Sequence, residues 1–510
     1  MRTVRSSLAS LALVLGLVLP FVSKPVHIDD ANFLALAQGA ALDPWRPHAV
    51  EINWQGSTER AFDVLSNPPG IAWWLAPWRE QPIEWLHLSL LPWLILALWG
   101  AWRLGQRLAG DGQAGLLVLG TAPVALLAAQ ALTPDLPLYA CALAGVGGFL
   151  GARRHAWAFA LLAGCAALFR YSGVCLVPLL LLAGYQRGRV AAAMASLIPI
   201  TALALHDLSA YGAIHLTAMG QFQAVSNTPR ELFRKGAAAL AMLGGVGVLP
   251  ALVLRLRTAI GGLFGLLVGL TAALISGQSG VAFGATLACC AAGGLAVGAL
   301  RLRSPEDRLL AAWTLGGLTF LLSLRFAAAR YWLPFLPGPA LAALRLGVSR
   351  RRLALAVAVQ ALVALGVSID DQNLARAQER AAREISSLGT GTFAGHWGWQ
   401  YAMEAAGWRP LEEDALPEGL FAVDWIAWPQ EPAERACLVP IRTLTMPDHF
   451  PGPRVHTAEG GANIHAYLVA GDPPVETYAP WSFSNEPYDR VTLYRPCGSL
   501  TRSPQDGSPP

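Results

Sequence analysis

The sequence predicts an α-helical polytopic membrane protein with a C-terminal α/β domain outside the cytoplasm. Three observations predict it. First, 54% of the 510 residues are hydrophobic and only 14% are charged, with a mean hydropathy of +0.43. Second, apolar runs of about 17–25 residues, long enough to cross a bilayer, recur as far as Ile369. Third, the composition then changes abruptly to mixed polar sequence of ordinary domain size. The net charge of +4 is small and indicates no nucleic-acid partner.

About 13 transmembrane helices are expected from these runs. Their predicted bounds are 8–22, 85–101, 114–132, 136–152, 156–169, 172–186, 190–206, 236–254, 258–275, 281–300, 309–324, 332–347 and 353–369. The predicted domains are therefore a membrane domain, 1–369, with a long first outer loop at 24–84, and a soluble domain, 370–510. The Pro/Ser/Gly-rich tail at 503–510 is expected to be disordered. The first span also fits a cleaved signal peptide, because basic residues precede its apolar stretch.

Arginines predict the sidedness of the junctions, because short Arg-rich junctions face the cytoplasm. Clusters fall on every second junction, at 2/5, 103/107, 153/154, 187/189, 255/257, 301/303/308 and 350–352. The other junctions, and after an odd number of spans the soluble domain, then face outward. In that location Cys437 and Cys497 could form a disulfide.

The outward face begins with the adjacent carboxylates Asp29 and Asp30, directly after the first span. Such a pair is costly unless it faces water, a cation or a substrate. Repulsion between the two carboxylates raises one pKa, which suits a residue that must accept a proton. The alternative is that one of them only caps the helix that begins at Ala31.

Four further outer junctions carry polar candidates. Asp135 precedes an apolar helix and also fits a helix cap. Arg170 interrupts an apolar hairpin, where a charge is a functional candidate. Arg330 and Tyr331 lie at the outer end of a span broken by proline. Since arginine binds phosphate with a two-pronged, permanently charged group, these cations opposite carboxylates indicate a phosphate-bearing ligand. His215 is more typical of an ordinary polar loop residue.

Several motifs resemble GT-C glycosyltransferases, most closely family 39, which includes protein O-mannosyltransferases and lipid A aminoarabinose transferases. The stretch 29–37 resembles the acidic start of that family's first periplasmic loop. Similar motifs follow at Asn67-Pro68-Pro69-Gly70, Thr133-Pro134-Asp135 and 330–337, and more weakly at 395–401. Their order, spacing and sidedness agree over roughly residues 1–350. Gly70 departs from the family pattern, in which leucine is usual.

The resemblance implies a glycosyltransferase in the bacterial inner membrane, with its active site on the periplasmic side. It would move a sugar from a polyprenyl-phosphate donor, which enters from the membrane lipids, to a lipid, glycan or protein acceptor. Inverting transfer needs a carboxylate base and positive charge at the departing phosphate. Asp29 is the expected base, and Asp30 and Asp135 would position either this base or the acceptor. The phosphate would be held by Arg170, Arg330 and Tyr331, with His215 as a weaker addition. A divalent metal ion is compatible with this chemistry but not required, and no other cofactor is expected.

Two alternatives stay open. A transporter or flippase would line a translocation path with charges, whereas nearly all charges here lie on junctions. A non-catalytic assembly subunit would keep the fold and lose the chemistry.

The soluble domain shows strand-like runs at 419–425, 436–441 and 490–494 and a helix-like run at 399–406, which predict a small α/β unit. It could cover the cavity and select the acceptor, or only stabilise the outer loops. His396, Trp397 and Trp399 would then stack on a sugar or belong to the domain core.

Overall fold

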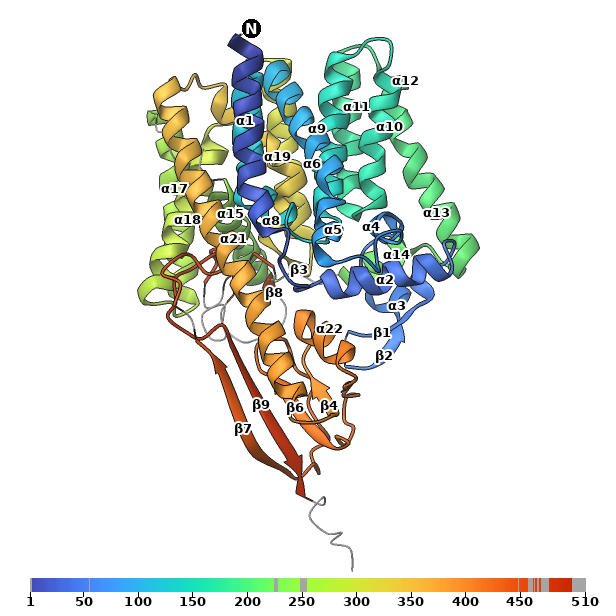
Figure 1. The fold of residues 1–510 in the computed structure, drawn as a ribbon. Coiled ribbons are helices and arrows are strands. Elements are labelled where there is room, and N and C mark those ends of the chain that lie inside the picture. Colours follow the sequence, from blue (N-terminus) through green and yellow to red (C-terminus); the bar gives the residue numbers. More distant parts are fainter. Residues whose placement is uncertain are drawn as a thin grey trace, which may run out of the picture.

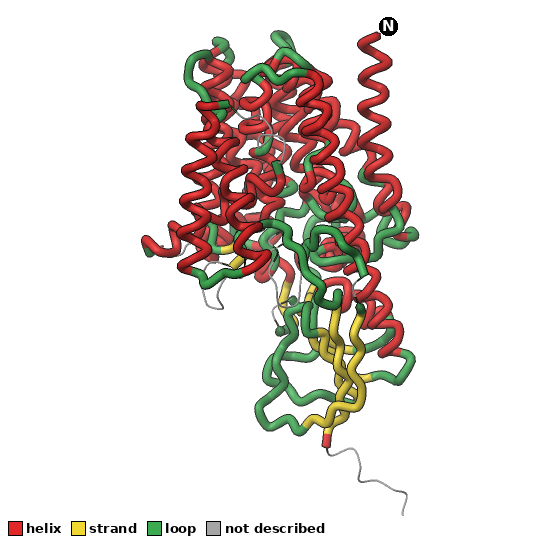
Figure 2. Tube along the Cα trace, turned by 90° about the vertical axis from the view of Figure 1, so that its left-hand side faces the viewer, coloured by secondary structure: helices red, strands yellow, loops and turns green. Residues whose placement is uncertain are grey.

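The computed structural model describes residues 2–497 apart from 55, 224–227, 248–254, 448, 457–461, 463, 466 and 469–476. The tail predicted to be disordered, and the last seven residues of the predicted span 236–254, lie outside the described residues. A bundle of helices forms one part of the molecule, and a small sheet lies beyond one end of it (Figures 1 and 2). The N-terminus lies at the opposite end of the bundle (Figure 1).

Each predicted span coincides with helical structure within the described residues. The bundle helices are α1 (Arg2–Val18), α6 (Leu91–Leu104), α7 (Gly112–Gly120), α8 (Pro123–Ala128), α9 (Asp135–Gly151), α10 (Ala156–Gly164), α11 (Leu176–Gln186), α12 (Val190–Ala193), α13 (Leu197–Tyr211), α15 (Pro229–Val246), α17 (Leu256–Ile275), α18 (Gly280–Gly298), α19 (Pro305–Ser323), α20 (Pro337–Leu344) and α21 (Arg350–Ser386). Among the described residues, five helical segments are long and apolar enough to cross a membrane: Ile83–Ala109, Val190–Tyr211, Thr258–Ile275, Gly280–Gly298 and Arg350–Ser386. The predicted class, a helical polytopic membrane protein with a C-terminal α/β domain, is confirmed.

Two spans differ from the prediction in their extent. The segment 114–132 is interrupted between α7 and α8, where Pro123 starts a new helix because proline favours the first helical turn. The last span does not end at Ile369, since α21 continues without a break to Ser386. The predicted domain boundary therefore falls inside a helix, whose second half packs on the C-terminal sheet (Figure 1).

Four of the Arg-rich junctions meet at one end of the bundle, as the alternation of charge predicts. Arg345 donates hydrogen bonds to the carbonyl oxygen of Leu108 and, at 3.0 Å, to Oγ of Ser304. Arg255 reaches the carbonyl oxygen of Gly347 at 2.8 Å. Junctions from four parts of the chain thus share one face. The assignment of this face to the cytoplasm rests on the positive-inside rule and stays a prediction.

The long first outer loop forms a layer between the bundle and the sheet domain (Figure 1). It comprises α2 (Asp30–Leu42), α3 (Ala61–Val64), α4 (Gly70–Leu75), α5 (Ile83–Leu88) and the hairpin of β1 (Glu51–Asn53) and β2 (Thr58–Arg60). Gly70 packs against the carbonyl of Leu168 so closely that no Cβ would fit. This contact requires glycine after the two prolines, where leucine is usual in the glycosyltransferase family that these motifs resemble.

The C-terminal domain is an α/β unit, as predicted. Among the described residues its main sheet has five strands, in the order β5-β4-β6-β9-β7. They are β4 (Gly391–Ala394), β5 (Arg409–Pro410), β6 (Leu420–Asp424), β7 (Leu438–Met446) and β9 (Asp489–Pro496). The β4 strand pairs in parallel with β5 and β6, whereas β9 pairs antiparallel with β6 and β7. The end of α21 and α22 (Trp397–Ala405) supply the core on one face. Cys437 and Cys497 are disulfide-bonded.

A short two-stranded ladder joins the C-terminal region to the bundle. Strand β3 (Phe326–Ala327) pairs antiparallel with β8 (Tyr467–Leu468). Because β3 directly precedes the Arg330 segment, this pairing brings the chain around His465 to the outer end of the bundle.

Candidate active site

A cavity of about 430 Å³ lies where the outer loop, the bundle and the C-terminal domain meet. It is lined by Ile28, Asp29, Asn32, Phe33, Trp54, Asp63, Val64, Leu65, Ser66, Asn67, Arg170, Met219, Arg325, Arg330, Tyr331, Trp397, Trp428, His456 and His465. Four of the residues predicted to form the site, Asp29, Arg170, Arg330 and Tyr331, are therefore brought together. We call this space the outer cavity.

Asp29 occupies the N-cap position of α2, but its carboxylate makes no capping hydrogen bond. It forms an ion pair with Arg330 instead and keeps 20% of its side-chain surface exposed. Burial alone would raise the pKa of Asp29, but the charge and hydrogen bond of Arg330 outweigh it and hold the pKa below its ordinary value. The capping alternative is therefore not what the Asp29 side chain does.

Asp30 is fully buried and holds the backbone around it. One carboxylate oxygen accepts a hydrogen bond from the backbone N–H of Leu132 at 2.8 Å, and the other from that of His27 at 3.2 Å. Burial raises the pKa of Asp30 to about 7. This carboxyl group thus fixes the start of α2 against the turn that precedes Asp135.

Asp135 lies in the first turn of α9 and forms an ion pair with Arg170. The Arg170 guanidinium also stacks over the Tyr331 ring, 4.5 Å from its centre. A guanidinium nitrogen of Arg330 lies 3.9 Å from the second oxygen of Asp135. The four charged groups thus form an alternating row, in the order Asp29, Arg330, Asp135 and Arg170. Two cations and two carboxylates leave the row neutral before any ligand binds.

A second cavity of about 360 Å³ adjoins the first. Both are lined by Ser66, Asn67, Arg170, Met219 and Tyr331. The second is otherwise lined by Tyr171, Ser172, Leu216, Gly220, Phe320, Ser323 and Leu324, which include the end of α19. Arg170 and Tyr331 therefore stand between the two spaces.

His215 is not brought to the phosphate-binding candidates. It begins α14 (His215–Gln223), is buried, and lines neither of the two cavities described above. Its Nδ1 lies 2.7 Å from the hydroxyl of Tyr171, and its backbone N–H donates to Asp207 at 3.2 Å. Its contacts indicate support of Tyr171.

The C-terminal domain contributes one wall of the outer cavity, which includes the predicted candidate Trp397 and also Trp428, which the sequence did not indicate. Trp397 and Trp428 line the outer cavity, and both adopt left-handed backbone conformations, with φ of 65° and 53°. Ile28, beside Asp29, has φ of 46°. Such conformations are rare for bulky or β-branched residues and concentrate at functional sites. Trp397 also packs in the domain core, with 8% of its surface exposed, whereas Trp399 is fully buried there and does not line the outer cavity.

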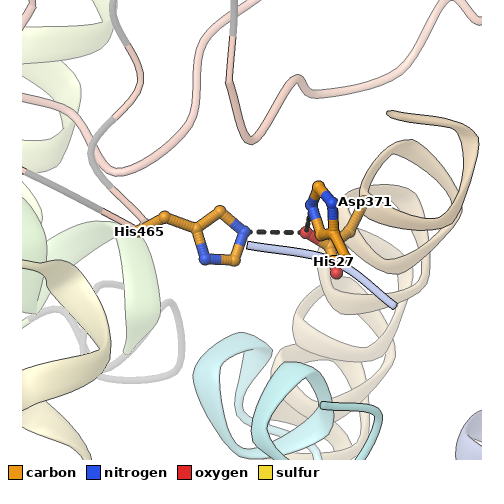
Figure 3. Close-up of side chains that lie close together, drawn as sticks. All are labelled: His27, Asp371 and His465. Atoms are coloured by element: carbon orange, nitrogen blue, oxygen red, sulfur yellow. Dashed lines mark hydrogen bonds and ion pairs between the residues drawn. The ribbon is translucent and has the colours of Figure 1, made fainter. Parts of the chain in front are cut away.

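Three further residues of types that bind metal ions lie together beside the outer cavity: His27, Asp371 and His465 (Figure 3). They come from three distant parts of the chain, so no local spacing could have indicated them.

Comparison with protein-family models gives no match, and comparison with curated proteins gives none. Among solved structures, the chain is similar to ArnT from Cupriavidus metallidurans in the apo state, with 13% identity, a TM-score of 0.42, and coverage of 83% of this chain and 93% of that one. The same protein bound to undecaprenyl phosphate gives 14% identity, a TM-score of 0.42, and coverage of 82% and 92%. The function therefore has to be inferred from the site itself.

Proposed function

We propose that this chain is an integral membrane glycosyltransferase that moves a sugar from a polyprenyl-phosphate donor to an acceptor on the outer face of the membrane. The observation that carries the proposal is the convergence of Asp29, Arg330 and Arg170 on one cavity. Such a transfer requires a general base and positive charge at the departing phosphate, and the carboxylate and the two guanidinium groups can supply these.

In the proposed step, Asp29 takes the proton of the acceptor hydroxyl, and the oxygen of that hydroxyl attacks the anomeric carbon of the donor sugar. The bond from that carbon to the phosphate oxygen breaks, and the electron pair leaves with the phosphate. Arg330 and Arg170 stabilise the negative charge that develops there, because permanently charged guanidinium groups bind phosphate oxygens in pairs.

The Asp29–Arg330 ion pair makes the basicity of Asp29 depend on whether the donor is bound. While Arg330 contacts Asp29, the carboxylate is a weak base, because its pKa is lowered. A donor phosphate would compete for the same guanidinium and add negative charge beside Asp29. Both effects raise the pKa of Asp29 and strengthen it as a base. The base is therefore activated when the donor is in place.

The two adjoining cavities suit two substrates. The second cavity, next to the end of α19, is proposed to receive the lipid phosphate, with Arg170 and Tyr331 at its boundary. The acceptor would enter the outer cavity, where the C-terminal domain supplies Trp397 and Trp428. Asp30 and Asp135 position the charged row, and His215 is assigned no contact with phosphate.

The test is sugar release from a polyprenyl-phosphate sugar by the purified chain in lipid nanodiscs. We expect cleavage of the bond from sugar to phosphate, which Asp29→Asn abolishes. Movement of intact donor across the bilayer of proteoliposomes, without cleavage, would instead identify a flippase. Absence of both, for a panel of donors and in the presence of cell-envelope acceptors, would contradict the proposal.

A further inference from the structure

His27, Asp371 and His465 form a compact cluster beside the outer cavity (Figure 3). Nε2 of His465 lies 2.7 Å from Oδ1 of Asp371, and Nε2 of His27 lies 3.2 Å from the same oxygen. One ligand atom from each residue lies within 4.8 Å of the other two. His27 precedes α2, Asp371 belongs to α21, and His465 precedes β8, so the cluster joins three segments.

The imidazole of His27 is unsatisfied despite its burial. Only 1% of its side chain is exposed, yet neither ring nitrogen has an aligned hydrogen bond to any of the described residues. The contact of Nε2 with Asp371 is close enough for an ion pair but poorly aligned for a hydrogen bond. Buried polar groups almost always have a partner, and one without a partner calls for an explanation such as a bound ion.

We infer that these three residues bind a divalent transition metal, of which zinc fits the donor set best. Two imidazole nitrogens and one carboxylate oxygen are typical zinc ligands, whereas magnesium and calcium prefer oxygen donors. Ligand bonds of about 2.0–2.2 Å would place neighbouring ligand atoms roughly 3.3 Å apart in a tetrahedral site. The 3.2 Å separation of His27 from Asp371 is close to this value, and the 2.7 Å separation of His465 is shorter, so His465 would have to move slightly outward to bind the ion. Three protein ligands leave a fourth position open.

Lys24 is not one of the three proposed ligands, but it holds one of them, Asp371, in place. Its ammonium group lies 2.8 Å from Oδ2 of Asp371, and both side chains are buried. That contact leaves Oδ1 for the metal and fixes the orientation of the carboxylate, as outer hydrogen-bond partners do in metal sites. The backbone N–H of His27 is held by Asp30 at 3.2 Å. The competing explanation is that the ion pair with Lys24 and the hydrogen bond with the His465 ring satisfy Asp371, and that no ion binds.

A metal here would fasten the C-terminal region to the start of the first outer loop. His465 lines the outer cavity and lies two positions before the start of β8, which pairs with β3. The ion would therefore fix one wall of the cavity that holds Asp29. This inference concerns metal binding and does not depend on the proposed transferase activity.

The test uses the full chain in detergent, stripped with a chelator and titrated with zinc at neutral pH. We expect about one zinc per chain by elemental analysis, and a cobalt-substituted form with the visible absorption of a tetrahedral site. His465→Ala and His27→Ala should each weaken zinc binding by at least ~100-fold, because loss of a ligand exceeds the 10–100-fold effect of an outer partner. His465 is the gentler change, since 13% of its side chain is exposed.

His456→Ala is the matched control. His456 also lines the outer cavity, but it does not belong to the cluster, so this variant should retain one zinc. Failure of the intact chain to bind zinc at micromolar concentration would overturn the inference. Equal binding by the wild-type chain and a folded His465→Ala variant would do the same.

Discussion

Asp29 and Arg330, 301 positions apart in the sequence, form an ion pair on the wall of the outer cavity. The pair joins the start of the first outer loop to the last outer junction of the bundle. Neither partner is fully enclosed, since 20% of the Asp29 side chain and 11% of the Arg330 side chain are exposed. A ligand can therefore reach both charges, which a purely structural ion pair would not require.

Asp29→Asn should reduce sugar transfer by at least ~100-fold, because the amide cannot accept the proton of the acceptor hydroxyl. Folding should be retained, because Arg330 keeps Asp135 as a neighbour at 3.9 Å. Transfer rates of the purified variant, together with its thermal unfolding, measure both effects. A variant with near-normal transfer would exclude Asp29 as the base.

Asp30→Asn is the matched comparison and should act mainly on stability. Its carboxylate accepts hydrogen bonds from two backbone N–H groups. In the asparagine variant the NH₂ group would replace one of the two oxygens, so one backbone N–H would lose its acceptor. An unsatisfied buried group costs about 1–3 kcal/mol. We expect a lower midpoint of thermal unfolding and a smaller loss of transfer than Asp29→Asn causes. The reverse pattern would transfer the catalytic role to Asp30.

Arg330→Lys should raise the donor KM by about 10-fold or more, because lysine keeps the charge but loses the paired hydrogen bonds to phosphate. Arg170→Lys should act in the same direction, since it also loses the stacking on Tyr331. Steady-state kinetics with varied donor at saturating acceptor measure this.

Tyr331 offers the control for the stacking contact. Tyr331→Phe keeps a ring under the Arg170 guanidinium and should change the donor KM less than Tyr331→Ala does. Equal effects of the two substitutions would show that the ring does not position Arg170.

Much of the fold could be predicted from the sequence because helices that insert into a membrane need long apolar runs and because positive charges mark their cytoplasmic ends. Apolar runs and alternating arginines gave the helices and the face on which Asp29, Arg170 and Arg330 meet. Strand-like runs in the soluble domain likewise correspond to β6, β7 and β9.

The rest depends on contacts between distant segments. No local pattern shows that α21 continues past Ile369, because its second half is stabilised by packing on the sheet. Nor could the pairing of β3 with β8, which brings His465 near Arg330, be predicted from two-residue strands. The place of His215 depends on such contacts too: it belongs to an outer junction in the sequence, and in the fold its Nδ1 lies 2.7 Å from the hydroxyl of Tyr171.

The sidedness of the site predicts the behaviour of a reporter fused after Pro510. Since the Arg-rich junctions alternate, a reporter that works only outside the cytoplasm should be active there. The same reporter inserted between Arg153 and Arg154 should be silent. Activity at the inner junction and silence at the C-terminus would invert the topology and remove the outer acceptor from the proposed function.

The buried pair Asp424 and Asp489 should make stability depend on pH. Burial raises the pKa of Asp424 to about 6, and burial with the negative charge of Asp424 raises the pKa of Asp489 well above its ordinary value. Unfolded aspartates lose their protons near pH 3.9. Between about pH 4 and 6 the folded state holds more protons than the unfolded state, so stability falls as the pH rises.

Asp489→Asn should remove part of this dependence, because the amide can still donate toward Asp424 and carries no proton to lose. We expect the midpoint of thermal unfolding at pH 8 to rise by at least ~2 °C, with little change at pH 4. Glu431→Gln, at an exposed position, is the control and should leave the pH dependence unchanged. An unaltered pH profile in Asp489→Asn would show that this carboxyl is not protonated in the fold.

Trp397 and Trp399 differ by two positions but should have different effects on the reaction. Trp397 lines the outer cavity, where its ring lies 5.1 Å from that of His456. Trp399 is fully buried and donates to the carbonyl oxygen of Ala394 at 3.1 Å. His396 is also buried, against Trp54. Trp399→Ala should therefore cost roughly 3–5 kcal/mol of stability, whereas Trp397→Ala should act on the acceptor.

The ratio of sugar transfer to hydrolysis of the donor by water separates the two effects, because it does not depend on the amount of folded protein. Trp397→Ala should lower this ratio at least ~10-fold, since an aromatic platform for the acceptor would be lost while Asp29 could still activate water. Trp399→Ala should lower both rates together and leave the ratio unchanged. If Trp397→Ala also leaves the ratio unchanged, its ring is packing, and acceptor recognition lies elsewhere on the cavity wall.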